Sequence, residues 1–335
     1  MIGTFARAIL IAAALSLPTA AAEPIRLKLS LISSDRSLIY LADVKPFVDA
    51  VNAEAKGTLQ IEIYFSGTLD KVAARQAQLV ADGVADMAFI LPGYTPERFC
   101  DNTVVELPGL FDNPREASYV FTRLIAHGVL KGYEDYFVIA ALMSPAENIQ
   151  SRRPIASITD LRGMVVRINN PTEAAVLEKL GMRPVPLAVN LTSEAISDGE
   201  IDSATVPPAL LFEFGIGRVV SYHYLLDIGS APLALVMNRK KFESLPEQAR
   251  NIIRKYSGEW PIARYLAAYE EAGDQVMKQL TSNSRRKVVY PSPSDLDTAH
   301  LVFKGVIDDW VAKSARNREL LQTVETEIAK LRATR

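Results

Sequence analysis

A nine-residue pattern occurs twice in this chain and constrains its architecture more than any other feature. The run DGVADMAFI at residues 82–90 returns as DGEIDSATV at 198–206, with Asp, Gly, Asp and Ala in register. Each copy follows a helix-like stretch, at 72–81 and 192–197, which itself follows an apolar stretch, LQIEIYF or MRPVPLAV. The pattern predicts the same strand, helix, glycine stop and strand in two similar lobes. The alternative is a chance likeness between two helix stops, because Asp and Gly commonly end helices.

The rest of the hydrophobic pattern favours an α/β fold with largely parallel strands, because strand-like and helix-like segments alternate. Asn113 and Glu116, with Pro114 at the first helical position, form the capping-box pattern of one helix start. Further strands are expected at 25–33, 165–168, 222–228, 233–238 and 287–290, and further helices at 38–55, 172–180, 207–214 and about 296–332.

A long amphipathic run from Pro246 to about Leu280 contains Pro261, which predicts a helix that is kinked or broken near Trp260. Such an element is long enough to cross two lobes. No low-complexity linker separates the lobes, so we expect strand crossovers near residues 145 and 230. The expected division assigns 23–145 and about 230–265 to lobe I, and 146–229 and about 266–335 to lobe II.

The amino terminus has the pattern of a signal peptide. Arg7 precedes an apolar stretch at residues 8–17, and Ala20 and Ala22 stand where a signal peptidase reads its substrate. The stretch is well short of the ~20 residues that a spanning helix needs. We expect residues 1–22 to be removed by cleavage after Ala22, which places the mature chain outside the cytoplasm. An uncleaved anchor is the alternative and would keep the same compartment.

Charge and motifs exclude several classes of function. The formal net charge of −2 is too close to neutral for a nucleic-acid binder, and no basic cluster is interleaved with aromatic residues. Cys100 is the single cysteine, so no internal disulfide is possible. His127, His223 and His300 lie in different predicted elements, and no hydrolase, zinc or phosphate-loop motif is present. We therefore expect no catalytic residues, metal or cofactor.

One side chain stands out as a candidate for ligand binding. Arg167 lies near the end of the apolar strand VVRI, and Asn169, Asn170 and Pro171 then turn the chain into the next helix. Two open α/β sheets that face each other enclose a cleft at the carboxyl ends of their strands. A guanidinium at such a strand end can bind a carboxylate through two parallel hydrogen bonds. The alternative is a structural arginine paired with an internal Asp or Glu.

The order DLRGMVVRINNP, LEKLGMRPVPL and DGEIDSATVPP resembles the DctP family, the solute-binding subunits of tripartite ATP-independent periplasmic (TRAP) transporters. AKGTLQIEIYFSGTL and VELPGLFDNPREA extend the resemblance, which runs from about residue 25 to 310. The resemblance implies a two-lobed, type II-like periplasmic binding protein, with Arg167 binding the carboxylate of an organic acid. It also implies delivery to a small and a large membrane permease subunit, with transport driven by an ion gradient.

The chain departs from the family at positions that would contact the ligand. Val206 stands where many members have Asn, and Glu147, beside Asn148, falls by spacing on a second Arg of some members. The segment FILPGYTPERF offers Leu91, Tyr94 and Phe99 to the rim of the pocket, and Asn169, Asn190 and Phe212 complete the expected set. One cationic residue in an otherwise apolar pocket fits a monocarboxylate with an apolar or aromatic body better than a small dicarboxylate or a sugar acid.

The predicted activity is binding and handover, with no chemistry on the ligand. Two other interpretations stay open at this point. A periplasmic binding protein that serves another transporter or a sensor kinase would have the same fold and cleft. A secreted hydrolase or lyase on an α/β scaffold would turn its ligand over instead of returning it unchanged.

Overall fold

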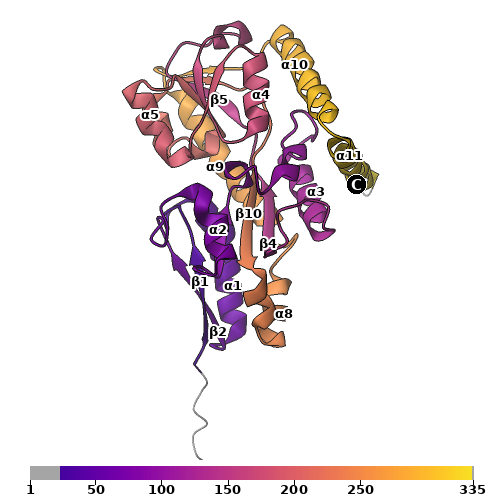
Figure 1. Cartoon of the computed structure of the whole chain (residues 1–335). Coiled ribbons are helices and arrows are strands. Elements are labelled where there is room, and N and C mark those ends of the chain that lie inside the picture. The colour runs from indigo at the N-terminus through magenta and orange to yellow at the C-terminus, as the bar shows by residue number, and fades with distance from the viewer. Residues whose placement is uncertain (1–22, 334–335) are drawn as a thin grey trace, which may run out of the picture.

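The two copies of the repeat occupy equivalent places in two separate sheets, one in each lobe (Figure 1). The computed structural model describes residues 23–333, so the predicted signal peptide and its cleavage site lie outside the described residues. Gly83 and Gly199 have φ angles of 75° and 83°. The two glycines follow helices α2 and α5, and their left-handed backbone conformation is one that glycine adopts more readily than other residues.

Lobe I contains a five-stranded sheet with the order β2-β1-β3-β10-β4. The first three strands are parallel, and β10 runs antiparallel to both of its neighbours. The strands are β1 (Ile25–Ser30), β2 (Leu59–Tyr64), β3 (Met87–Ile90), β4 (Tyr136–Met143) and β10 (Pro232–Asn238).

Lobe II contains a six-stranded sheet with the order β11-β9-β5-β8-β6-β7. Here β5 is the strand antiparallel to both neighbours, and the other five strands run in one direction. Each sheet is therefore largely parallel, as expected, with one antiparallel strand inserted, β10 or β5. The strands are β5 (Asn148–Ser151), β6 (Val165–Ile168), β7 (Arg183–Pro186), β8 (Ser203–Val206), β9 (Tyr222–Tyr224) and β11 (Lys287–Val289).

Helices cover both faces of the sheets (Figure 1). The longer helices are α1 (Lys45–Ala55), α3 (Pro114–Ala126), α4 (Pro171–Lys179), α8 (Glu247–Lys255), α9 (Ile262–Ser282), α10 (Pro293–Ala312) and α11 (Ala315–Ala333). The shorter ones are α2 (Gln76–Ala81), α5 (Thr192–Asp198), α6 (Ile216–Val219) and α7 (Arg239–Ser244). Single 3-10 turns are η2 (Ala73–Arg75), η3 (Pro92–Tyr94), η4 (Cys100–Val104), η5 (Ile158–Leu161), η6 (Val189–Leu191) and η7 (Pro208–Leu210).

The second aspartate of the repeat makes the same pair of hydrogen bonds in both lobes. Asp86 donates its backbone N–H to the carbonyl of Lys28 at 2.9 Å, and its carboxylate accepts the N–H of Lys28 at 2.7 Å. Asp202 does the same with the carbonyl of Val165 at 2.8 Å and the N–H of Val165 at 3.0 Å. These bonds fix each repeat against its parallel neighbour, β1 or β6, so the repeat reflects a shared local structure.

The side chains of the lobe I strands β3, β4 and β10 are divided between two apolar cores. In β10, Leu233, Leu235 and Met237 pack in the core that α1 and α8 cover. Ala234 and Val236 point to the other face and pack in the core that α3 and α11 cover. Burial on both faces explains why this strand reads as a continuous apolar run instead of an alternating one.

Several predicted helices have different ends or shapes. Residues 207–214 form a 3-10 turn, η7, followed by irregular turns instead of a helix. The predicted helix at 296–332 is two helices, because the side chain of Ser314 accepts the N–H of Asn317 at 3.0 Å and begins a new helix. That new helix, α11, packs in a lobe I core rather than on lobe II, to which its residues were expected to belong, through Leu320, Val324 and Ile328.

Helix α9 connects the two lobes. The break between α8 and α9 covers residues 256–261 and contains Pro261, as predicted. Tyr265 near the start of α9 packs in a lobe I core, and Leu280 near its end packs in a lobe II core. The chain also crosses between the sheets from β4 to β5 and from β9 to β10, where the sequence predicts crossovers. The chain therefore passes between the lobes at two strand crossovers, along α9, and again near the end of α10, where Phe303 packs in a lobe II core and Trp310 packs in a lobe I core.

The helix expected at 38–55 is interrupted by a π-helical turn, η1 (Tyr40–Val44), which holds a buried carboxyl group. Asp43 is 1% exposed, and neither of its carboxylate oxygens has a hydrogen-bond partner in the described structure. Burial raises the pKa of Asp43 to about 7. An unpaired buried carboxylate is costly, so the folded protein favours the protonated form.

We predict that Asp43→Asn stabilises the protein at high pH. Because the pKa is raised on folding, the folded state binds more protons between about pH 4 and 7, and the wild type loses stability as pH rises through that window. At roughly 1.4 kcal/mol per pKa unit, the variant should exceed the wild type by about 2 to 4 kcal/mol near pH 8 and match it near pH 4.

Urea unfolding at a series of pH values measures this difference in stability. The other buried acids are the same in both proteins, so their contributions to the pH dependence cancel in the comparison. Asp49→Asn, a change at an exposed position of α1, is the matched control and should stay within about 0.5 kcal/mol of the wild type at every pH. Parallel pH profiles for Asp43→Asn and the wild type would contradict the prediction.

Candidate functional site

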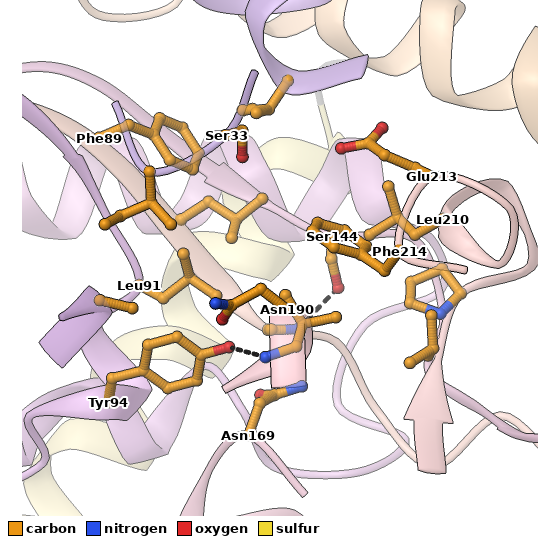
Figure 2. Close-up of a pocket in the computed structure, with 18 of the residues that line it drawn as sticks. Ser33, Phe89, Leu91, Tyr94, Ser144, Asn169, Asn190, Leu210, Glu213 and Phe214 are labelled. Carbon is orange, nitrogen blue, oxygen red and sulfur yellow. Dashed lines mark hydrogen bonds between the residues drawn. The ribbon is translucent and has the colours of Figure 1, made fainter. Parts of the chain in front are cut away.

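A pocket lies between the two lobes, where the carboxyl ends of β3 and β6 face each other. Its volume of about 130 Å³ is roughly ten times what a single water requires. The lining is mainly apolar: Leu31, Ile32, Ile39, Phe89, Leu91, Val189, Val206, Pro207, Leu210, Phe214, Ala231 and Leu233. In Figure 2, Phe89 and Leu91 line one side, and Leu210 and Phe214 line the other. The pocket has the size and character of a site for a small, largely apolar molecule.

Arg167 provides the positive charge of the pocket. Its side chain is 2% exposed and donates three hydrogen bonds: Nε to the carbonyl of Leu187 at 2.8 Å, Nη1 to the carbonyl of Thr205 at 3.0 Å, and Nη2 to the hydroxyl of Tyr94 at 3.0 Å. A guanidinium has five N–H groups, so one N–H on each terminal nitrogen is left over. Within residues 23–333, no carboxylate lies within ion-pair distance of Arg167. A buried cation with an N–H group left over on each terminal nitrogen is suited to binding an anion.

Tyr94 connects lobe I to lobe II at this end of the pocket. Its hydroxyl accepts a hydrogen bond from Arg167 and another from the backbone N–H of Val189 at 3.1 Å. The proton of the hydroxyl is therefore available to a ligand. Gly93 permits this close approach, since a Cβ at that position would lie 2.8 Å from the carbonyl oxygen of Asn169. Only a residue without a side chain fits there.

Two buried glutamates, Glu147 and Glu173, lie near Arg167 and are connected by hydrogen bonds from Asn169. The Asn169 amide donates to Oε1 of Glu147 and to Oε1 of Glu173, both at 3.3 Å. Burial raises the pKa of Glu147 well above its usual range, the charge of Glu173 raises it further, and Arg167 opposes both. Burial likewise raises the pKa of Glu173, against the hydrogen bond from the Asn169 backbone and the charge of Arg167. Of these residues, Glu147, Asn169 and Arg167 line the pocket.

Two further carboxyl groups connect the lobes away from Arg167. Glu213 lies at the opposite end of the pocket from Tyr94 (Figure 2), and its Oε2 accepts the N–H of Leu38 at 2.8 Å. Burial raises the pKa of Glu213. Glu106, outside the pocket lining, accepts the hydroxyl of Thr172 at 3.1 Å, and burial raises its pKa to about 8. The conformation described is therefore one in which hydrogen bonds join the lobes across the cleft.

Most of the residues predicted from the sequence meet at this pocket, and three do not. Arg167, Tyr94, Glu147, Asn169, Asn190 and Val206 line it, as does Leu91.

Asn148 is absent from the pocket lining, and its amide donates to the carbonyl of Leu226. Phe212 packs over Gly217, with Arg286 above its ring, because residues 207–214 turn instead of forming a helix. Phe99 is buried in a lobe I core against Tyr133.

Prediction from the sequence missed several residues that line the pocket. Glu213 is the most notable, and the one signal for it is a charged residue inside the apolar run LLFEFG. Ser144, Phe89, Phe214 and Tyr269 also line the pocket. Phe89 lies in β3, Ser144 in the β4–β5 crossover, Phe214 in the turn after η7 and Tyr269 in helix α9. Nothing in the local sequence distinguishes these residues from core residues.

Across residues 23–333, no group of three or more His, Cys, Asp or Glu side chains is arranged to hold a metal ion. In the same range, none of the helices combines the length and the apolar character needed to cross a bilayer.

Sequence comparison connects this fold and pocket to a known family. A family model described as bacterial extracellular solute-binding protein, family 7 (DctP) matches residues 29–314. The C4-dicarboxylate-binding periplasmic protein DctP of Rhodobacter capsulatus is 24% identical over 299 residues, which cover 85% of this chain and 89% of that protein. An uncharacterized protein of Haemophilus influenzae is 24% identical over 206 residues, which are 60% of this chain and 62% of that relative.

Solved structures of the same kind superpose on nearly the whole chain. A marine metagenome TRAP solute-binding protein specific for aromatic acid ligands, in complex with metahydroxyphenylacetate, gives a TM-score of 0.83 at 25% identity over 91% of this chain and 99% of that one. A TRAP solute-binding protein of Rhodoferax ferrireducens with copurified benzoate gives 0.83 at 23% identity over 92% and 99%. These superpositions confirm the predicted two-lobed α/β fold.

We predict that Tyr94→Phe destabilises the ligand-free protein. The change leaves Nη2 of Arg167 and the N–H of Val189 without the hydroxyl that both now use, and buried unpaired donors cost about 1 to 2 kcal/mol. Urea unfolding measures the loss. Tyr290→Phe, at a side chain that is 68% exposed, is the control and should change stability by less than about 0.5 kcal/mol. If neither Tyr94→Phe nor Tyr290→Phe changed the stability, the prediction would be wrong, and the lobes would be apart in the ligand-free protein.

Proposed function

The chain belongs to the DctP family of bacterial extracellular solute-binding proteins, family 7, and we propose that its ligand is an organic monocarboxylate with an apolar or aromatic body. The observation that carries this proposal is Arg167, a buried guanidinium with two free N–H groups and no carboxylate within ion-pair distance among the described residues. The ligand carboxylate binds there, and the apolar lining surrounds the rest of the molecule.

The carboxyl groups around the pocket favour a single negative charge on the ligand. Glu147 and Glu213 both line the pocket, where Arg167 is the one cationic side chain in the lining. A second ligand carboxylate would be desolvated beside these acids with no cation to pair with it. The structural relative specific for aromatic acids supports the same ligand class, at 25% identity. The name of the Rhodobacter relative points instead to C4-dicarboxylates, so the two classes need a direct test.

Binding couples to closure of the cleft. The ligand contacts Arg167 and Val206 of lobe II and Tyr94 and Phe89 of lobe I, so it binds the closed form better than the open one. The ligand shifts the equilibrium towards the closed form by the difference between its affinities for the two forms. The closed protein then delivers its ligand to the small and large membrane subunits of a TRAP transporter. It does so in the periplasm, after cleavage of the signal peptide following Ala22.

Mass spectrometry of the small molecule that copurifies with residues 23–335 identifies the natural ligand after denaturation of the protein. We expect a monocarboxylate, and we expect the same compound to raise the melting temperature of the refolded protein. An uncharged or cationic ligand would contradict the proposed role of Arg167.

We predict that Arg167→Ala nearly abolishes binding. Loss of a desolvated, charge-assisted pair costs about 2 to 5 kcal/mol, which corresponds to at least roughly a thirtyfold loss of affinity. Arg167→Lys should also bind weakly, because an ammonium keeps the charge but loses the two parallel donors. Calorimetric titration with benzoate and with the copurified acid measures both variants. Arg183→Ala, at an exposed arginine of β7, is the control and should bind like the wild type.

We further predict that small dicarboxylates such as succinate bind at least about a hundredfold more weakly than aromatic monocarboxylates, because their second charge has no cationic partner. Competition titration against a bound aromatic acid measures the ratio. A protein that binds succinate-like diacids and no aromatic acid would refute the apolar-pocket argument.

A further inference from the structure

Glu147 carries a buried carboxylate oxygen with no partner. The side chain is 3% exposed and lines the pocket, and its Oε2 atom has no hydrogen bond in the described structure. The other oxygen, Oε1, accepts two long bonds, from Asn169 at 3.3 Å and from the hydroxyl of Ser144 at 3.4 Å. Buried polar atoms are almost always paired, so an unpaired one on a residue that lines a binding pocket points to a group on the ligand.

The neighbouring polar side chains, Asn169 and Ser144, already form hydrogen bonds with other groups of the protein. The amide of Asn169 donates to both Glu147 and Glu173, and its oxygen accepts from the amide of Asn170 at 2.9 Å. The hydroxyl of Ser144 makes its shorter bond, 2.8 Å, to the carbonyl of Pro145. Asn169 and Ser144 therefore position the Glu147 carboxyl group and leave its Oε2 atom free. The partner of Oε2 must come from outside the protein.

The charge state of Glu147 selects the kind of partner. Burial and the nearby charge of Glu173 raise the pKa of Glu147, so the group retains its proton at higher pH than an exposed glutamate does. A protonated carboxyl group can both donate and accept a hydrogen bond, and a hydroxyl group does the same. A ligand carboxylate fits poorly here, because burial and the charge of Glu173 disfavour a further negative charge at this position.

Resting on the proposed function, we propose that Glu147 binds a hydroxyl group of the ligand, which makes hydroxylated aromatic monocarboxylates the preferred ligands of this protein. Arg167 then binds the carboxylate, and Glu147 forms a hydrogen bond with a hydroxyl group elsewhere on the same molecule. Glu213, the other carboxyl group in the lining, is less suited to this role because its Oε2 already accepts the N–H of Leu38.

Matched pairs of acids with and without a hydroxyl group test the proposal. Benzoate is compared with its three hydroxybenzoate isomers, and phenylacetate with mandelate and the ring-hydroxylated phenylacetates, by calorimetric titration near neutral pH. We expect one isomer in at least one series to bind about tenfold or more tightly than its parent acid, since a site built to pair with a hydroxyl disfavours the analogue that lacks it.

Glu147→Leu should reduce that ratio to less than about threefold, because the side chain no longer offers a polar partner. Glu147→Gln keeps a donor and an acceptor in the same shape, should retain a ratio well above that of the Leu variant, and serves if the Leu variant does not fold. Glu106→Gln changes another buried carboxyl group outside the pocket lining and should leave the ratio as in the wild type.

The outcomes separate this proposal from the one it rests on. If no monocarboxylate with an apolar or aromatic body binds the wild type, both proposals fail. If aromatic acids bind and depend on Arg167, but no hydroxylated isomer exceeds its parent, the hydroxyl role of Glu147 is refuted and the proposed function stands. The hydroxyl role is also refuted if the preference persists unchanged in Glu147→Leu, since Oε2 would then be paired with water.

Discussion

The buried guanidinium of Arg167 is the interaction on which the rest of the site depends. It holds together the carbonyl of Leu187, the carbonyl of Thr205 and the hydroxyl of Tyr94, which come from three segments and both lobes. Its charge also opposes the raised pKa values of Glu147 and Glu173. A cation this deeply buried is costly unless an anion pairs with it. In the proposed function, the carboxylate of the ligand supplies that anion when the cleft closes.

The duplicated unit explains how the two lobes present their strand ends to one cleft. Asp86 and Asp202 each bind both backbone polar groups of one residue in the neighbouring parallel strand. The resulting register places Ser30 opposite Ala88 in lobe I and Arg167 opposite Ala204 in lobe II, so these two positions are equivalent. One copy of the architecture carries the cationic side chain that the cleft needs, and the other carries a small polar residue.

Local patterns predicted the elements and part of the site well. The strand VVRI was expected at 165–168 and is β6, and the break at Pro261 separates α8 from α9. Arg167 could be singled out because a cation in an apolar strand is unusual. Asn148 and Phe212 were placed wrongly, since the face of a strand or an irregular turn that meets the pocket depends on packing. Neither Glu213 nor the mixed strand directions could be derived from periodicity, because both depend on where the chain crosses between lobes.

The sequence by itself determined that the chain is an α/β protein of two similar units, and the pattern of its amino terminus predicts export. Periodicity, helix stops and the spacing of short motifs are local properties, so they are visible in the order of the residues alone. Only the tertiary structure decided which polar groups lack partners inside the protein, because pairing depends on segments far apart in the chain. The free N–H groups of Arg167 and the unpaired oxygen of Glu147 are defined by what surrounds them, and that surrounding exists only when the two lobes are folded against each other.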